Sequence, residues 1–187
     1  MDQDASPADQ PTRRLVIVRH ARAEGVAPSD QDRALTQRGH EDAAAAGRWL
    51  GARMPVGSRG AGRTQGLVSS ARRAAQTWEG LVAGSGWGVE AVHDEALYVA
   101  GPDAALDLVR ATSQDVTTLV LVGHNPTMGY LAPMLDDGEG HDEATTELAT
   151  SGFPTCTLAV LTLVGAWGDL DAGGARLEAF HVARADA

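Results

Sequence analysis

The stretch LVIVRHARAE, residues 15–24, begins with four apolar residues and continues directly into an arginine and a histidine. A short apolar run rich in β-branched side chains is typical of a strand that is buried on both faces of a sheet. The run therefore predicts a strand over residues 14–18. Arg19 and His20 stand at the carboxyl end of this strand, which is where open parallel sheets bind their ligands.

Apolar runs alternate with helical patterns along the 187 residues, a length suited to one domain. This alternation predicts a three-layer α/β/α fold, with a mostly parallel sheet flanked by helices and an antiparallel edge from the last two strands. We expect one domain over 13–182 with loose tails at 1–12 and 183–187. The acidic segment 135–155 is predicted to be a mobile surface segment. Strands are expected within 14–18, 66–70, 89–98, 117–123, 156–164 and 175–182, and helices over 35–54, after residue 70, from Pro102 and from Pro126.

The composition excludes several classes of function. A formal net charge of −10 argues against sequence-independent binding of nucleic acid, because phosphate backbones are held by surplus cations. The single cysteine, Cys156, excludes an internal disulfide. No signal-like or membrane-spanning apolar stretch is found, so the sequence predicts a cytoplasmic protein without a membrane partner.

Cations or histidines follow three of the predicted strands. Arg19 and His20 follow the first, Arg73 lies just inside the helix after the second, and His124 follows the strand over 117–123. Because the carboxyl ends of parallel strands meet along one edge of the sheet, these residues are expected to share a pocket. Helix N-termini at the same edge would add N–H donors and a positive potential. The sequence therefore predicts an anion site at this edge.

Arginine and histidine together suit a phosphoryl group. Arginine is always charged, and its planar donors match pairs of phosphate oxygens. A neutral histidine nitrogen can attack phosphorus, which gives a phosphohistidine intermediate that water then hydrolyses. These residue types therefore predict phosphoryl transfer, in which the protein mainly positions the group and stabilises its oxygens.

Three motifs in this order, VRHARAE, SSARRAAQT and LVGHNP, resemble those of the histidine phosphatase superfamily, also called phosphoglycerate mutase-like. Ala21 replaces the glycine that usually follows the Arg-His pair, which makes the chain similar to the SixA-like phosphohistidine phosphatase branch. The segments DRALTQRG (32–39), DEALY (94–98) and SGFPTCTLAVL (151–161) resemble further parts of that branch. The likeness covers roughly residues 14–165 and implies a phosphoglycerate mutase-like fold.

The resemblance implies that His20 is the nucleophile that becomes phosphorylated, without a cofactor or a metal. It implies that the phosphate group is bound by Arg19, Arg73 and His124. Arg73 is preferred over its neighbour Arg72 because RAAQT (73–77) matches the Arg-Ala-x-x-Thr of the family. Arg22 is a candidate for substrate binding at the mouth of the pocket, the alternative being a solvated surface arginine.

Larger family members protonate the leaving group with a glutamate, or with an aspartate directly after the second histidine. Asn125 occupies the second of these places and is expected to cap the helix that follows it. Glu95, beside Asp94, is the positional candidate for a general acid, the alternative being a loop carboxylate. Zinc binding by His20 and His124 is the rival interpretation, but the adjacent arginines would repel a cation.

The sequence thus predicts a cofactor-independent phosphatase that hydrolyses a phosphomonoester or a protein phosphohistidine. The expected partner is a phosphorylated protein, including a phosphohistidine domain, or a small phosphate ester. Two alternatives stay open: a module that binds phosphate or phosphoprotein without turnover, and a small-molecule phosphatase or mutase. A chain of this length leaves little material for a lid, so we expect an open pocket.

Overall fold

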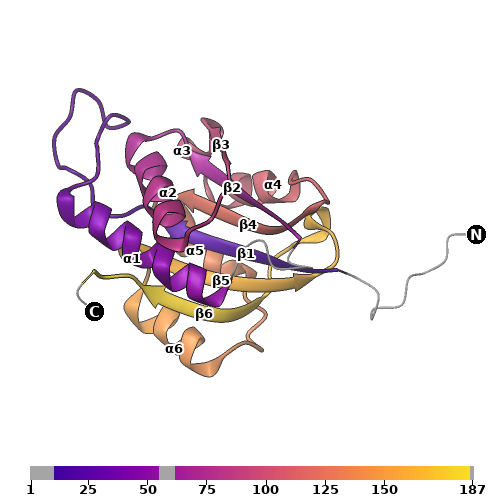
Figure 1. The fold of residues 1–187 in the computed structure, drawn as a ribbon. Coiled ribbons are helices and arrows are strands. Elements are labelled where there is room, and N and C mark those ends of the chain that lie inside the picture. The colour runs from indigo at the N-terminus through magenta and orange to yellow at the C-terminus, as the bar shows by residue number, and fades with distance from the viewer. Residues whose placement is uncertain (1–10, 55–61, 186–187) are drawn as a thin grey trace, which may run out of the picture.

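The centre of the protein is a six-stranded sheet in the order β3-β2-β4-β1-β5-β6 (Figure 1), seen in a computed structural model that describes residues 11–54 and 62–185. Strands β1 to β4 run parallel to one another, whereas β5 pairs antiparallel with β1 and β6 antiparallel with β5. The mostly parallel sheet with an antiparallel edge is therefore confirmed. The strands are β1 (Thr12–Arg19), β2 (Arg63–Ser69), β3 (Ala91–Asp94), β4 (Val116–Gly123), β5 (Thr157–Val164) and β6 (Arg176–Val182).

Helices cover both faces of the sheet, as Figure 1 shows. The side chains of β1 alternate between the two faces: Val16 and Val18 pack with α1 and α2, whereas Leu15 and Ile17 pack with α4, α5 and α6. All four side chains are fully buried. No helix of the described residues is long and apolar enough to cross a bilayer. The helices are α1 (Gln37–Arg53), α2 (Arg72–Ser85), α3 (Ala96–Val99), α4 (Pro102–Arg110), α5 (Thr127–Leu135), α6 (Asp142–Ser151) and the 3-10 turn η2 (Trp167–Asp169).

The helices α1 and α2 lie in close contact because small residues face each other. A Cβ on Gly84 of α2 would collide with the carbonyl oxygen of Ala44 on α1. Thr36 caps α1 by accepting a hydrogen bond from the N–H of Gly39 at 3.0 Å. This tight pairing fixes the position of α2, whose first turn lies at the carboxyl edge of the sheet.

The acidic segment 135–155 is more ordered than its composition suggested. It contains α6, and Ala144 and Leu148 of this helix are buried in the core on the α5 side of the sheet. The expectation of a mobile segment was therefore wrong for this part. Two buried apolar residues are enough to anchor a helix whose other face is acidic and solvated.

The two predicted tails also differ from expectation where the structure describes them. Residues 1–10 lie outside the described residues, but β1 already begins at Thr12. Of residues 183–185, Ala183 is fully buried, and its N–H donates to the carbonyl oxygen of Cys156 at 3.0 Å. The chain after β6 is thus held against the start of β5 instead of being loose.

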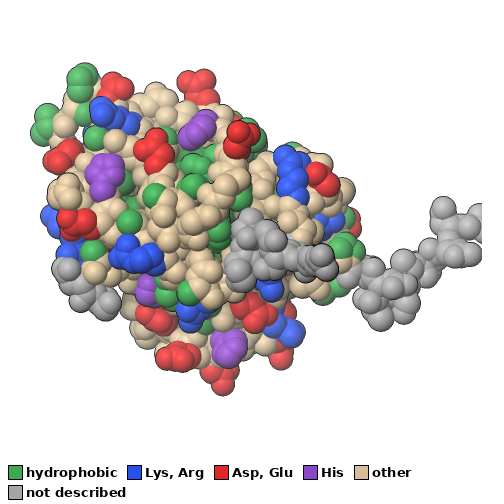
Figure 2. Space-filling model, in the orientation of Figure 1, with side chains coloured by type: hydrophobic (Ala, Val, Ile, Leu, Met, Phe, Trp, Pro, Cys, Tyr) green, Lys and Arg blue, Asp and Glu red, His purple; other side chains and the backbone are tan. Residues whose placement is uncertain are grey.

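Charged side chains of both signs are mixed on the face shown in Figure 2. Arginines are interspersed with aspartates and glutamates, and the described residues of this face form no broad basic patch. This distribution matches the net charge of −10. The absence of a nucleic-acid partner stays a prediction.

Candidate functional site

His20 directly follows β1, at the edge where β1 and β4 end together. Its N–H donates to the carbonyl oxygen of Gly123 at 3.0 Å, and its own carbonyl oxygen accepts from the N–H of Cys156 at 3.1 Å. The ring atom Nδ1 lies 2.8 Å from the carbonyl oxygen of Ala21. This contact favours a proton on Nδ1, so that the lone pair is on Nε2.

Arg73, the second residue of α2, faces that lone pair. Its Nε donates to Nε2 of His20 at 3.3 Å. Its Nη1 donates to the carbonyl oxygen of Asp30 at 2.6 Å, and its Nη2 to the Asp30 carboxylate at 3.0 Å. Arg73 is buried whereas Arg72 is exposed. Of the two adjacent arginines, Arg73 is therefore the one that contacts His20.

His124 follows β4 and lies beside His20, with the ring centroids 5.0 Å apart. Its Nε2 is 2.8 Å from Oγ of Ser69, the last residue of β2. Ser69 Oγ also accepts from the N–H of Ala71 at 3.3 Å, so its own proton is available to Nε2 of His124. This pattern favours the tautomer of His124 that carries its proton on Nδ1.

Arg19 reaches the segment after α6. Its Nη1 donates to the carbonyl oxygen of Phe153 at 2.8 Å, and Nδ2 of Asn125 donates to the same oxygen at 2.8 Å. The expectation that Asn125 caps the next helix was wrong. Pro126 occupies the N-cap position of α5, and the Asn125 side chain binds across to Phe153 instead.

Burial keeps both histidines of the site neutral. It is the main cause that lowers the pKa of His20 to about 4, and the charges of Arg73 and Arg19 lower this pKa further. Burial also lowers the pKa of His124 to about 3, followed by the effects of His20 and Arg73. Neutral imidazole is therefore the form of both rings at neutral pH.

Asp30 and Tyr98 join the site although the sequence patterns did not single them out. Oδ2 of Asp30 accepts hydrogen bonds from Nη2 of Arg73 and, at 2.7 Å, from the hydroxyl of Tyr98. The ring of Tyr98 stands edge-on to that of His124, with centroids 5.6 Å apart. The only available signal was position: Asp30 comes two residues before the DRALTQRG segment, and Tyr98 ends DEALY.

Two predicted site residues are not brought into this network. The Arg22 side chain is exposed. The backbone carbonyl oxygen of Arg22 accepts a hydrogen bond from the N–H of Thr36 at 2.9 Å. Glu95 is also exposed, and its carboxylate has no hydrogen bond or ion pair among the described residues. Substrate binding by Arg22 and acid catalysis by Glu95 therefore stay predictions.

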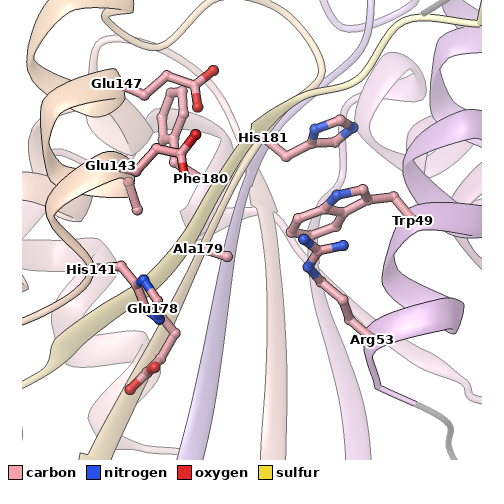
Figure 3. Close-up of a pocket in the computed structure, with 10 residues that line it drawn as sticks. Trp49, Arg53, His141, Glu143, Glu147, Glu178, Ala179, Phe180 and His181 are labelled. Atoms are coloured by element: carbon pink, nitrogen blue, oxygen red, sulfur yellow. The ribbon is translucent and has the colours of Figure 1, made fainter.

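A separate cavity of about 450 Å³ lies along β6 between α1 and α6 (Figure 3). On one wall Trp49 stacks on His181 with ring centroids 4.6 Å apart, and the Arg53 guanidinium lies 4.2 Å from the Trp49 ring centroid. Glu143 and Glu147 line the other wall. The cavity shares no lining residue with the His20 site. Nowhere in the described chain does a group of three or more His, Cys, Asp or Glu form a metal site.

Comparisons with known proteins agree with this geometry. The profile of the histidine phosphatase superfamily (branch 1) matches residues 15–98. The Mycobacterium tuberculosis (strain H37Rv) protein Rv1276c is 38% identical over 170 residues, which cover 89% of this chain and 100% of the relative.

Two solved structures are similar over almost the whole chain. A Nakamurella multipartitia protein assigned as a phosphohistidine phosphatase SixA is 31% identical with a TM-score of 0.75, covering 94% of this chain and 99% of the other. The protein histidine phosphatase SixA complexed with tungstate is 25% identical with a TM-score of 0.65, covering 90% and 96%. With a matching fold and these sequence relatives, the chain belongs to the SixA-like branch of the histidine phosphatase superfamily.

Proposed function

We propose that this phosphatase transfers a phosphoryl group to Nε2 of His20 and then to water. The observation that carries the proposal is the arrangement around this ring. Nδ1 is held by the Ala21 carbonyl, and Nε2 is turned toward the guanidinium of Arg73 at 3.3 Å. A neutral, oriented imidazole beside a fixed cation is what an in-line attack on phosphorus needs.

Donors for the phosphoryl oxygens are close to His20. Arg73 Nε would exchange its contact with Nε2 for a phosphoryl oxygen once the P–N bond forms. Nε of Arg19 and Nδ1 of His124 are buried without a hydrogen-bond partner in the described part of the chain. Phosphoryl oxygens would supply the missing acceptors. The similar SixA structure is complexed with tungstate, an oxyanion like phosphate, which supports an oxyanion as the ligand of this class of protein.

The proposed reaction has two steps. The Nε2 lone pair of His20 forms a bond to phosphorus while the bond from phosphorus to the leaving group breaks. Water then attacks phosphorus, the P–N bond to His20 breaks, and inorganic phosphate and a proton are released. Arg19, Arg73 and His124 stabilise the phosphoryl oxygens in both steps.

For the substrate, we propose a phosphohistidine carried by a protein. Among the described residues no group contacts the Glu95 carboxylate and orients it as an acid, so a substrate whose leaving group needs little protonation fits the site best. A phosphohistidine leaves as imidazole, and protonation of its ring by solvent is enough to weaken the P–N bond. The names of the SixA relatives support this class. A small phosphate ester is the second candidate.

Trapping the intermediate tests the proposal. Protein is quenched during turnover of a radiolabelled phosphohistidine protein, and we expect label on His20 that is stable to base and labile to acid. His20→Ala should lose at least about a thousandfold in kcat/KM. His40→Ala, at an exposed position of α1, is the matched control and should resemble the wild type.

Two outcomes would contradict the proposal. Unchanged activity of the His20→Ala variant would exclude His20 as the nucleophile. Tight phosphate binding without turnover would favour the binding module. Parallel assays with sugar phosphates and a chromogenic aryl phosphate distinguish the substrate classes, and activity should persist in EDTA.

A further inference from the structure

The guanidinium of Arg73 has a partner on each of its nitrogens. Nε faces Nε2 of His20, whereas Nη1 and Nη2 both contact Asp30, through its carbonyl oxygen at 2.6 Å and its carboxylate at 3.0 Å. Asp30 thus holds the outer edge of the guanidinium. This leaves Nε directed at the nucleophile.

Asp30 is itself fixed from several sides. Its Oδ1 accepts from Nη1 of Arg33 at 2.9 Å, and its Oδ2 accepts from the Tyr98 hydroxyl at 2.7 Å. The next carbonyl oxygen along the loop, that of Gln31, accepts from the N–H of Arg72 at 3.0 Å. The loop is therefore attached to the first turn of α2, which is the turn that carries Arg73.

Tyr98 connects this loop to the second histidine. Its ring stands edge-on to His124, and the Arg73 guanidinium lies 5.9 Å from the Tyr98 ring centroid. The Arg73 guanidinium is therefore contacted by Asp30 at its outer edge and lies near the ring of Tyr98. Asp30 comes from the loop before α1 and Tyr98 from α3, so neither stands at the end of a strand.

Asp30 cannot serve as the missing proton donor. Hydrogen bonds from Tyr98 and Arg33 hold the pKa of the Asp30 carboxyl far below its usual range, and Arg73 adds to this effect. The group is therefore a carboxylate at neutral pH. A permanent negative charge beside the site opposes a phosphate anion in the ground state.

We propose that Asp30, supported by Tyr98, is a positioning residue that orients Arg73 for phosphoryl transfer at the expense of affinity for free phosphate. The inference rests on the proposed function, because it assumes that Nε2 of His20 receives the phosphoryl group. A fixed guanidinium meets the phosphoryl oxygens without reorganisation, which favours the transition state over the bound ground state. The Asp30 carboxylate also lowers the affinity of the enzyme for the phosphate product.

The test separates turnover from affinity. Asp30→Asn keeps the size of the side chain and removes its charge, and Tyr98→Phe keeps the ring and removes the hydroxyl. We measure kcat and KM for an aryl phosphate and, by calorimetry, the Kd for inorganic phosphate. Asp32→Asn in the same loop, whose carboxylate accepts only from Ser29 among the described residues, is the control.

We expect Asp30→Asn to lower kcat about tenfold or more and to tighten the Kd for phosphate severalfold, since one charged hydrogen bond to Arg73 is lost. Tyr98→Phe should move both quantities the same way but less. The double variant should show less than the sum of the two effects, because both act through Arg73. Asp32→Asn should match the wild type.

A wild-type kcat in a folded Asp30→Asn variant, or an increased kcat, would overturn the inference. So would phosphate binding that is no tighter than in the wild type, and Tyr98→Phe provides the same readouts should Asp30→Asn fail to fold. If the wild-type protein hydrolyses none of the substrates, the proposed function fails. The Kd comparison then still decides whether Asp30 opposes phosphate.

Discussion

Oγ1 of Thr77 accepts a hydrogen bond from the N–H of Ala21 at 3.0 Å and donates one to the carbonyl oxygen of Arg73 at 2.6 Å. Thr77 is fully buried. The hydroxyl therefore joins Ala21, the residue after His20, to the helix that carries Arg73. Arg73 and Thr77 are one turn of α2 apart in RAAQT, and this spacing brings the hydroxyl to the Arg73 carbonyl oxygen.

Thr77→Val should lower the free energy of unfolding by about 1–3 kcal/mol, because the variant keeps the shape of the side chain and leaves the Ala21 N–H buried without a partner. Urea denaturation measures the loss. Thr146→Val, at an exposed position of α6, should change stability by less than about 0.5 kcal/mol. Equal stabilities of the two variants would show that the Thr77 hydroxyl contributes nothing to the fold.

The two adjacent arginines should respond differently to the same change. Arg73→Lys removes the fork that contacts His20 and Asp30 at the same time, so we expect kcat/KM to fall about tenfold to a hundredfold. Arg72→Lys keeps the charge of an exposed side chain and should leave kcat/KM unchanged. Steady-state kinetics with one substrate compares them, and a larger effect at Arg72 would contradict the assignment.

Stability should fall as the pH is lowered below about 6.5. The pKa of His20 drops from 6.5 to about 4 on folding and that of His124 to about 3, so the unfolded chain binds more protons in this range. The stabilisation is present above pH 6.5 and is lost as the pH falls toward the folded values. Melting temperatures across this range measure it. A His20→Gln/His124→Gln variant with an equally steep dependence would assign the effect to other groups.

The low pKa of His20 should also show in the pH dependence of activity: on the acid side, kcat/KM should fall only at an unusually low pH. Nε2 of His20 is unprotonated above a pH of about 4, so kcat/KM for an aryl phosphate should not require a group that titrates near 6.5 in the free enzyme. A pH–rate profile at constant ionic strength tests this. A limb centred near the ordinary histidine value would show that burial does not depress the pKa of His20.

Gly39→Ala should destabilise the protein by about 1–3 kcal/mol, because an added Cβ collides with the carbonyl oxygen of Arg22 and must move α1 or the loop. The same substitution at Gly25 has nothing within 4 Å of the added carbon and should be close to neutral. Chemical denaturation of both variants gives the comparison. A stable Gly39→Ala protein would mean that α1 can shift at little cost.

The strands, and the sheet edge at which His20 and His124 lie, could be predicted from the sequence because their signals are local. The apolar runs that form β1 and β4 are readable without knowing their neighbours, and the polarity of a parallel sheet then brings His20 and His124 together. The superfamily and the three-layer fold followed from the same motifs. Arg19, His20 and His124 stand at or directly after the ends of these two runs, so their place at this edge is also readable locally.

Other features depend on contacts that no local pattern contains. Asp30 reaches Arg73 because of the path of its loop, and the Asn125 amide binds Phe153 because the segment after α6 returns to the site. The helix α6 was missed because its charged residues outnumber the two buried ones that anchor it. Tertiary contacts outweighed composition and capping preference in each case.

The strand β1 is hydrogen-bonded along its length to β4 on one side and to β5 on the other, in the middle of the sheet. We therefore expect the backbone that holds His20 to be among the last parts of the protein to open, whereas the exposed loop around Asp30 should open at a lower free energy. At low denaturant concentration, activity should first decline because the loop that carries Asp30 opens. The remaining activity should be lost only in the cooperative unfolding transition that separates the central strands.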